Sequence, residues 1–197
     1  MTPQAESILE LFRSTGAYLS GHFRLTSGLH SPAYLQCALV LQYPRHAATL
    51  GGLLADELRN LTPEPVGLVV SPALGGLIIG HEVARALDAR FIFTERDASG
   101  KMTLRRGFAV TPGEPALVVE DVVTTGGSTR DVVEVLRAAG ARPLAAGSIV
   151  DRSGGHANVG APRVALVTLD VVAYDPAQCP LCAQGVPAVK PGSRPDY

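Results

Sequence analysis

The 197-residue sequence has no tryptophan, only three cysteines and no excess of basic residues. Three cysteines cannot form a disulfide framework, and a small odd number is typical of a reducing compartment. Lysine and arginine number 17 against 18 acidic residues, and this net charge of −1 does not favour nucleic-acid binding. The apolar stretch 66–80 is shorter than the roughly 20 residues that span a bilayer, and the acidic N-terminus does not resemble a signal peptide. We therefore expect a cytoplasmic protein without nucleic-acid or membrane partners.

Cys179 and Cys182 form a single Cys-x-x-Cys pattern, and Cys37 stands alone. A zinc site usually has four ligands, and neither a second such pattern nor a close histidine pair accompanies this one in the sequence. The two thiols are expected either in an ordinary turn or in half of a metal site that a second subunit completes. The histidines are expected on the surface or in packing contacts: His22, His30, His46, His81 and His156.

Helix and strand signals alternate along most of the chain. Apolar residues at helical spacing, often after a Pro or Gly, predict helices from Thr2-Pro3 onward and over 44–60, 75–87 and 128–139. Short apolar runs predict buried strands over 67–71, 90–95, 116–119 and 144–150. This order predicts an α/β fold whose mainly parallel sheet has helices on both faces. We expect a single domain over 1–197, with a turn-rich stretch at 14–32 and an irregular tail from about 175.

The segment 96–106 interrupts this alternation with small and charged residues after the end of a strand. It fits either a plain hairpin connection or a mobile loop over a binding site. The mobile loop is favoured, because ligands of such sheets bind beyond the carboxyl ends of the strands.

The most informative segment is 116–129, in which an apolar strand ends in Glu120 and Asp121 and a Thr/Gly/Ser loop then opens a helix. Backbone N–H groups and the dipole at a helix start favour anions, so the loop is suited to a phosphate. Ribose hydroxyls can donate to the acids, and Mg²⁺ can screen their charge. The sequence therefore indicates a ribose 5-phosphate site, the plainer alternative being an acidic strand end before a capped helix. Walker A, GxGxxG and GxSxG motifs do not occur.

The segment VVEDVVTTGGST (118–129) resembles the phosphoribosyl pyrophosphate motif of the type I phosphoribosyltransferases. Three further segments resemble the orotate phosphoribosyltransferases in particular: FRLTSGLHSP (23–32), IVDRSGG (149–155) and CPLC (179–182). The resemblance spans nearly the whole chain. It implies the type I phosphoribosyltransferase fold, with a small N-terminal hood region and a mobile loop.

The resemblance also implies an activity, which is transfer of ribose 5-phosphate from phosphoribosyl pyrophosphate to orotate. The products would be orotidine 5′-phosphate and pyrophosphate, in pyrimidine (UMP) biosynthesis. Mg²⁺ would be bound mainly through the substrate, with no metal ligand assigned to a protein side chain. The protein would be a homodimer whose mobile loop closes over the neighbour's site.

Residue roles follow from the same resemblance. Glu120 and Asp121 would hold the ribose hydroxyls and act in catalysis. Lys101 is also expected to act in catalysis, because a cation over the departing pyrophosphate would stabilise its developing charge. Thr124 and Arg152 would contact orotate, although Arg152 could instead form a surface ion pair with Asp151. The implied donor-binding residues are Glu120, Asp121, Val122, Val123, Thr124, Thr125, Gly126, Gly127 and Ser128, and the loop 72–76 would receive pyrophosphate. Arg96 and Lys101 are added to the donor-binding residues because of their positive charge in the loop after the strand 90–95, and not through the resemblance.

Three departures from the family pattern concern the pyrophosphate contacts. Thr26 and Gly75 stand where many family members have lysine, and the loop 95–101 lacks the usual Lys- and His-rich composition. Two other functions are therefore kept as alternatives. One is transfer to a purine or another base, which would not need Arg152 for a carboxylate. The other is a regulator that senses phosphoribosyl pyrophosphate, against which the near-neutral charge argues.

Overall fold

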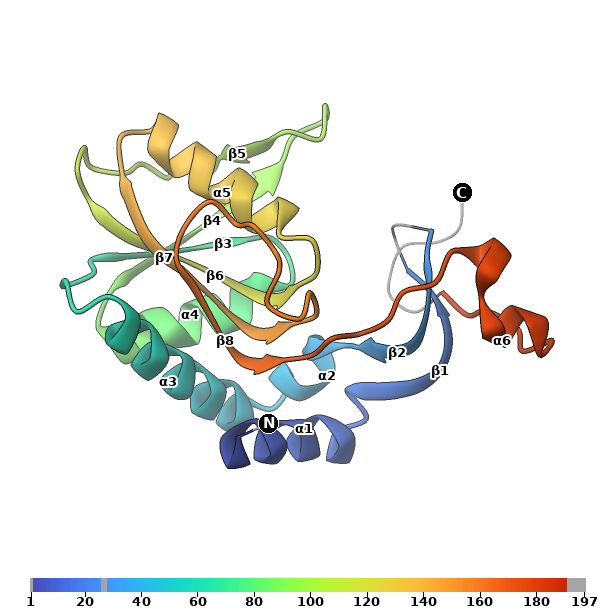
Figure 1. The fold of residues 1–197 in the computed structure, drawn as a ribbon. Helices are drawn as coiled ribbons and strands as arrows, with labels where there is room; N and C mark the ends of the chain where they lie inside the picture. Colours follow the sequence, from blue (N-terminus) through green and yellow to red (C-terminus); the bar gives the residue numbers. More distant parts are fainter. Residues whose placement is uncertain (1, 26–27, 191–197) are drawn as a thin grey trace. The chain divides into compact units, whose positions relative to one another are not determined.

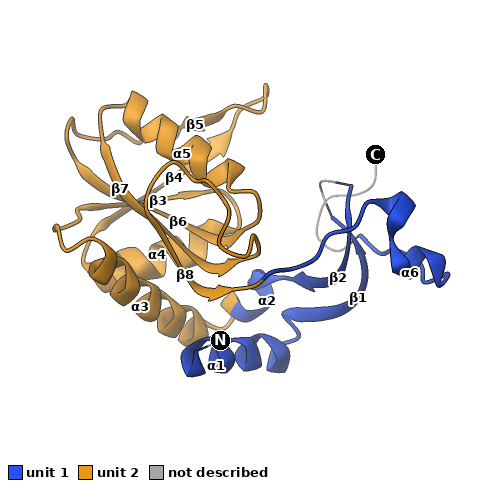
Figure 2. Cartoon of the chain, viewed as in Figure 1, with its two compact units in different colours: residues 1–40, 170–197 blue, residues 41–169 orange. Residues whose placement is uncertain are grey.

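The computed structural model describes residues 2–25 and 28–190. The chain forms two compact units, of which unit 1 comprises residues 1–40 with 170–197 and unit 2 comprises residues 41–169 (Figure 2). Within the described ranges, no helix is both long and apolar enough to cross a membrane. The expectation of one functional domain over the whole chain stays a prediction.

Unit 2 is built on a sheet of six described strands in the order β5-β4-β3-β6-β7-β8. Their bounds are β3 Leu68–Pro72, β4 Arg90–Arg96, β5 Met102–Leu104, β6 Pro115–Val123, β7 Arg142–Asp151 and β8 Arg163–Thr168. Neighbouring strands run parallel except β4 and β5, which form an antiparallel hairpin. The four predicted strands are confirmed, and with them the mainly parallel sheet.

Helices cover both faces of this sheet. The helices α3 (Pro44–Leu61) and α4 (Gly76–Leu87) pack on one face, and α5 (Gly127–Ala138) packs on the other (Figure 1). On α3, Leu50, Leu54 and Leu58 are fully buried, as their helical spacing predicts. The α/β layering expected from the sequence is therefore confirmed.

Glycines allow close packing between these layers. A Cβ added at Gly51 of α3 would lie 2.5 Å from the Cβ of Glu82 on α4. A Cβ at Gly80 of α4 would lie 2.0 Å from the Oγ of Ser71 on β3. At these glycines, both helices approach their neighbours more closely than a side chain would permit. Helix α4 is thereby held tightly between α3 and the end of β3.

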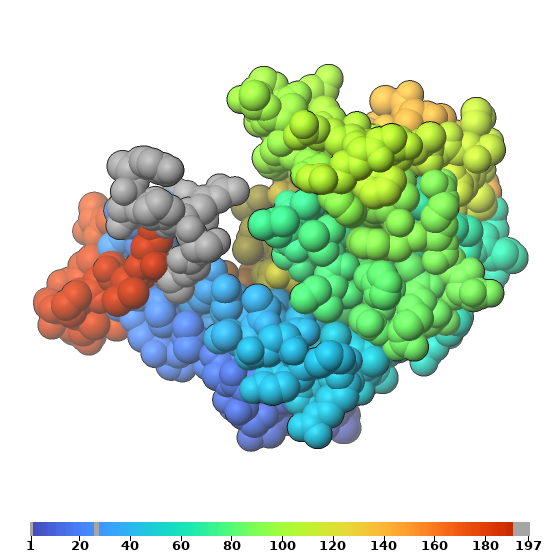
Figure 3. Space-filling model, turned by 180° about the vertical axis from the view of Figure 1, so that it is seen from behind, coloured from blue at the N-terminus to red at the C-terminus, as the bar shows by residue number. Residues whose placement is uncertain are grey.

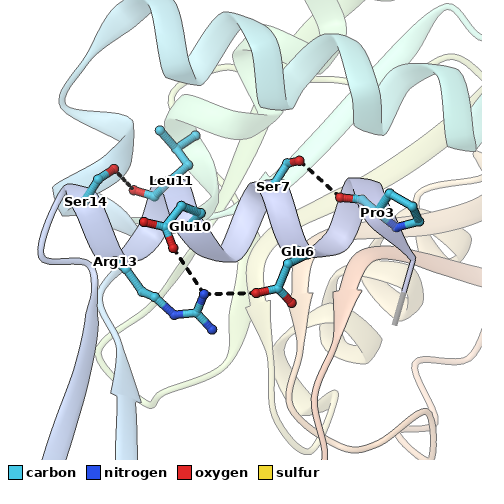
Figure 4. Close-up of polar contacts among 7 residues, drawn as sticks. All are labelled: Pro3, Glu6, Ser7, Glu10, Leu11, Arg13 and Ser14. Carbon is cyan, nitrogen blue, oxygen red and sulfur yellow. Dashed lines mark hydrogen bonds and ion pairs between the residues drawn. The ribbon is translucent and has the colours of Figure 1, made fainter.

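Unit 1 begins with α1 (Pro3–Ser14), which is capped by Thr2: its Oγ1 accepts a hydrogen bond from the Ala5 N–H at 3.2 Å. Figure 4 shows the outer face of this helix, where Arg13 donates to Glu6 at 3.0 Å and to Glu10 at 3.2 Å. Such exposed ion pairs contribute little to stability. The buried face carries apolar residues, among them Ile8 and Phe12, whose helical spacing predicts that they share one face.

The stretch 14–32, expected to be turns, instead forms most of an antiparallel hairpin. Its strands are β1 (Tyr18–Arg24) and β2 (His30–Leu35), and this hairpin is the small N-terminal region that the resemblance implies. A short helix α2 (Cys37–Leu41) follows. The C-terminal tail is not wholly irregular, because it contains a 3₁₀ turn η1 (Pro176–Gln178) and α6 (Pro180–Ala183).

Two neighbouring glycines of α3 test the packing account. Gly51→Ala should lower the unfolding free energy by about 1–3 kcal/mol, because the added methyl group would overlap the backbone of Glu82. Gly52 has open space, so Gly52→Ala should raise the unfolding free energy by about 0.5–1 kcal/mol through helix propensity. Urea denaturation followed by circular dichroism measures both. Equal effects of the two substitutions would contradict the account.

Candidate active site

Three parallel strands bring their carboxyl ends to one edge of the unit 2 sheet. The strand β6 pairs with β3, placing Val118 opposite Val70, and with β7, placing Val123 opposite Asp151. The segments that follow these strands therefore meet at that edge: residues 72–76, 120–128 and 151–155. This is where ligands of parallel sheets bind.

The loop after β6 leads directly into the first turn of α5. Gly126 precedes this helix with a φ of +80°, and a Cβ there would lie 2.9 Å from a methyl group of Val159. Only glycine suits both the left-handed backbone and the close approach. Thr124 and Thr125 are exposed beside it, and Gly126 has no side chain to cap the helix. The N–H groups of the first turn can therefore bind an anion such as phosphate.

Glu120 lies at the end of β6, where it accepts a hydrogen bond from the Oγ1 of Thr129 on α5. Burial raises the pKa of Glu120 to about 7. The Thr129 hydrogen bond and the charge of Arg96 oppose this rise, whereas the Asp121 carboxylate adds to it. Glu120 is thus poised to ionise near neutral pH, and a nearby cation would favour its charged form.

Asp121 lies near the end of β6, against Gly75 of the loop after β3. A Cβ added at Gly75 would lie 2.6 and 2.8 Å from the two carboxylate oxygens of Asp121. The Asp121 carboxylate thus lies against the backbone of Gly75, in space that a side chain at position 75 would share with it. Burial raises the pKa of Asp121, against the hydrogen bonds from the backbone N–H groups of Val122 and Asp121.

Arg152 follows β7, and its backbone N–H donates to the carbonyl of Val123 at 2.8 Å. This bond holds Arg152 beside the start of the 124–128 loop. The neighbouring Asp151 is buried and accepts hydrogen bonds from the Ser153 backbone N–H at 2.8 Å and from Arg163. Burial alone would raise the pKa of Asp151, but these partners hold it below its usual value. Asp151 therefore supports the turn that presents Arg152.

The segment 96–106 contains the tip and second strand of the β4–β5 hairpin, which stands out from the surface of unit 2 (Figures 1 and 3). The hairpin, one of the two alternatives expected from the sequence, is present, and the mobility of this segment stays a prediction. Arg96 donates to Asp131 of α5 at 3.0 Å, to the Gly100 carbonyl at 2.7 Å and to the Ser128 Oγ at 3.5 Å. Lys101 lines a cleft of about 300 Å³ along α5, together with Arg96 and Asp131. Arg96 thus contacts the phosphate loop directly.

Unit 2 brings together Glu120, Asp121, Arg152, Arg96 and the 124–128 loop. Thr26, the other position where family members have lysine, lies outside the described residues. Sequence reasoning did not foresee three supporting contacts: Thr129 with Glu120, Asp121 over Gly75, and Arg163 with Asp151. The contact of Thr129 with Glu120 could have been predicted, because both residues belong to the motif 118–129. The other two join segments that are distant in the sequence.

The chain is similar to known proteins in both sequence and fold. The phosphoribosyl transferase domain family matches the chain over residues 39–173. The chain is 53% identical over 189 residues to an orotate phosphoribosyltransferase of Desulforamulus reducens, covering 96% of this chain and 97% of the relative.

Solved structures share the fold at lower identity. An orotate phosphoribosyltransferase from Aeropyrum pernix matches with a TM-score of 0.64 and 24% identity, over 82% of this chain and 93% of that one. An adenine phosphoribosyl transferase from Trypanosoma brucei matches with a TM-score of 0.61 and 17% identity, over 85% of this chain and 80% of that one. The expected fold is confirmed, and because the two enzymes differ in their base, the fold does not identify the acceptor.

The raised pKa of Glu120 predicts a specific pH dependence of stability. The folded protein keeps a proton on Glu120 that the unfolded chain releases as the pH rises from 4.5 to about 7. This group therefore lowers the unfolding free energy across that window. Glu120→Gln removes the effect, so its stability relative to the wild type should increase between pH 4 and pH 8, on the order of 2–3 kcal/mol.

Denaturation curves of both proteins at the two pH values measure this difference. Glu57→Gln on α3 makes the same chemical change at a residue outside the proposed site and serves as the control. Loss or weakening of the hydrogen bond to Thr129 would change the free energy of unfolding by the same amount at both pH values. Parallel pH profiles for the wild type and Glu120→Gln would contradict the raised pKa.

Proposed function

The chain belongs to the phosphoribosyl transferase family and, within it, to the orotate phosphoribosyltransferases of pyrimidine biosynthesis, and we propose how its residues carry out that reaction. Ribose 5-phosphate passes from phosphoribosyl pyrophosphate to orotate, which gives orotidine 5′-phosphate and pyrophosphate. The bond from C1 of the ribose to the pyrophosphate oxygen breaks, and a bond from C1 to a ring nitrogen of orotate forms. Each reactant needs its own place at the edge of the sheet.

The loop 124–128 holds the 5-phosphate of the donor. The observation that carries this assignment is Gly126, whose φ of +80° and contact with Val159 open the first turn of α5 to an anion. The hydroxyls of Thr124, Thr125 and Ser128 add donors around the phosphate. Val122 and Val123 supply backbone groups between the acids and the loop.

Glu120 and Asp121 accept hydrogen bonds from the ribose hydroxyls. Transfer passes through an oxocarbenium-like state, by analogy with glycoside cleavage, so the two carboxylates stabilise the positive charge that develops on the ribose. The loop 72–76, whose Gly75 lies against Asp121, receives the pyrophosphate.

Mg²⁺ fits this site because its preferred ligands are oxygen atoms, and the half-buried acid pair would gain from a compensating charge. Bound mainly through the donor's pyrophosphate, the ion would neutralise charge between the donor and the carboxylates. It would thereby favour the ionised form of Glu120. We also propose that the enzyme is a cytoplasmic homodimer in which the β4–β5 hairpin acts on the neighbour's site.

Arg152 and Thr124 bind orotate. The two residues follow the paired positions Asp151 and Val123 at the ends of β7 and β6, so they lie on adjacent segments. A guanidinium matches a carboxylate through two parallel hydrogen bonds, and orotate carries a carboxylate that uracil and the purine bases lack. The proposed acceptor contact therefore also explains selectivity among bases.

An assay with a panel of bases tests the function. The protein is incubated with phosphoribosyl pyrophosphate, Mg²⁺ and either orotate, uracil, hypoxanthine or adenine, and consumption of the base is followed. Orotate should be consumed fastest. Faster consumption of another base would contradict the assignment, and consumption of none would indicate a protein that only binds the donor.

Arg152→Ala should weaken orotate binding by about 2–5 kcal/mol, because the carboxylate then loses its partner. Binding of phosphoribosyl pyrophosphate should stay nearly unchanged. Arg152→Lys keeps the charge without the bidentate geometry, so its orotate binding should be weaker than that of the wild type and stronger than that of Arg152→Ala. Steady-state kinetics with orotate and calorimetry with the donor separate these effects. Equal loss of donor and orotate binding would show that Arg152 does not recognise the base.

Lys101→Ala should reduce turnover by a larger factor than donor affinity, because a cation over the departing pyrophosphate stabilises charge that develops only in the transition state. Arg85→Ala, which removes a cation from the surface of α4, should leave turnover unchanged. Mixing Lys101→Ala with inactive Asp121→Asn should restore activity if the hairpin acts across a dimer. Full turnover of Lys101→Ala would leave Arg96 as the candidate cation.

A further inference from the structure

Four side chains with metal-binding atoms converge in unit 1, apart from the residues of the proposed reaction. His22, His30, Cys179 and Cys182 place one nitrogen or sulfur atom each within 4.8 Å of one another. His22, His30 and Cys179 are buried, and Cys182 is exposed. The sequence did not suggest this cluster, since 157 residues separate His22 from Cys179. From the sequence, we expect the two thiols in an ordinary turn or in half of a metal site completed by a second subunit, whereas the structure places two histidines of the same chain beside them.

The distances between these atoms suit a tetrahedral metal centre. The Cys179 Sγ lies 3.4 Å from the His22 Nε2, and the Cys182 Sγ lies 3.3 Å from the His30 Nδ1 and 3.8 Å from the His22 Nε2. The two imidazole nitrogens are 2.8 Å apart. Around a zinc ion, with Zn–S about 2.3 Å and Zn–N about 2.0–2.1 Å, tetrahedral ligand atoms lie about 3.3–3.8 Å apart. The histidines need to separate only slightly to receive the ion.

The backbone of the hairpin aims both histidines at one point. The pairing of β1 with β2 shifts register between Ser20 and Phe23, and His22 lies within this irregularity. As a result His22 and Phe23 are buried one after the other, where a regular strand would alternate. Such bulges redirect side chains next to functional sites. His30 opens β2 on the adjoining strand.

The two cysteines come from the C-terminal segment, which lies beside the hairpin (Figure 1). Cys179 immediately precedes α6 and Cys182 lies within it, and residues three apart share one face of a helical turn. Backbone hydrogen bonds fix this segment on both sides of the cluster. Tyr174 exchanges hydrogen bonds of 2.8 and 2.9 Å with His30, and the Val189 N–H donates to the His22 carbonyl at 2.8 Å.

The surroundings of His22 set the protonation that a metal ligand needs. Its Nδ1 lies 2.7 Å from the carbonyl oxygen of Val186, which can only accept, so the proton resides on Nδ1. The Nε2 lone pair then faces the two sulfur atoms. A histidine ligand held from behind by a backbone carbonyl is the usual outer arrangement of protein metal sites.

We propose that His22, His30, Cys179 and Cys182 bind one structural Zn²⁺ ion within a single chain. Two imidazoles and two thiolates in a tetrahedral arrangement favour zinc, and four protein ligands leave no open position for catalysis. Binding would displace the thiol protons and neutralise the charge of the ion. The ion would cross-link the segment 174–189 to the β1–β2 hairpin within unit 1, in addition to the backbone hydrogen bonds.

Metal analysis of the full chain tests this proposal. The protein is produced in zinc-supplemented medium, freed of any histidine tag and assayed by mass spectrometry for metals, where about one zinc per chain is expected. The double variant Cys179→Ser/Cys182→Ser should lose the zinc, and His22→Ala and His30→Ala should each retain much less. Cys37→Ser and His81→Ala remove a thiol and an imidazole elsewhere, and both should keep the full zinc content.

Measurements on the wild type keep the test decisive if the variants fail to fold. X-ray absorption should find two sulfur and two nitrogen neighbours around zinc, and Co²⁺ should give the visible absorption of a tetrahedral thiolate site. Removal of zinc by a chelator should make the tail beyond residue 174 more sensitive to proteolysis. Wild-type protein that neither contains nor takes up zinc, a Cys179–Cys182 disulfide in its place, or equal zinc loss in Cys37→Ser would overturn the proposal.

Discussion

The parallel pairing of β6 with β3 and β7 is the constraint on which the proposed active site depends. Because the three strands run the same way, the segments that follow them meet at one edge, although they are far apart in the sequence. A slip of one residue in β6 would move the side chain of Glu120, and likewise that of Asp121, to the face of the sheet opposite the one it now occupies. The register is held by buried apolar residues along β6 and, at its end, by the hydrogen bond from Arg152 to Val123.

That geometry creates an electrostatic conflict which the substrates can relieve. Two neighbouring carboxylates lie at a half-buried strand end, and burial raises the pKa of both. The helix start beside them favours an anion, so both the acid pair and the helix start would gain from a bound partner. Ribose hydroxyls, a donor-bound Mg²⁺ and a phosphate supply these partners together. The same conflict explains why stability and ligand binding should both respond to pH near neutrality.

Much of unit 2 could be predicted, because local patterns decide it. The strands β3 and β6 are continuous apolar runs, and the Thr/Gly/Ser loop marks the start of α5 in the sequence itself. The β1–β2 hairpin was missed because Gly21 and Gly28 suggest turns and the bulge at His22 breaks the alternation. Contacts such as Asp121 over Gly75, or Cys179 beside His22, depend on the register of distant segments. No local pattern reveals them.

The central claim is that one edge of the unit 2 sheet holds the phosphate, the ribose and the base in a fixed order. A crystal structure with bound orotidine 5′-phosphate tests it most directly. The account predicts the phosphate on the N–H groups of residues 125–128, the ribose hydroxyls at Glu120 and Asp121, and the carboxylate of the base against Arg152. A nucleotide bound in the reverse direction, with its phosphate at residues 72–76 or at Arg152, would contradict it.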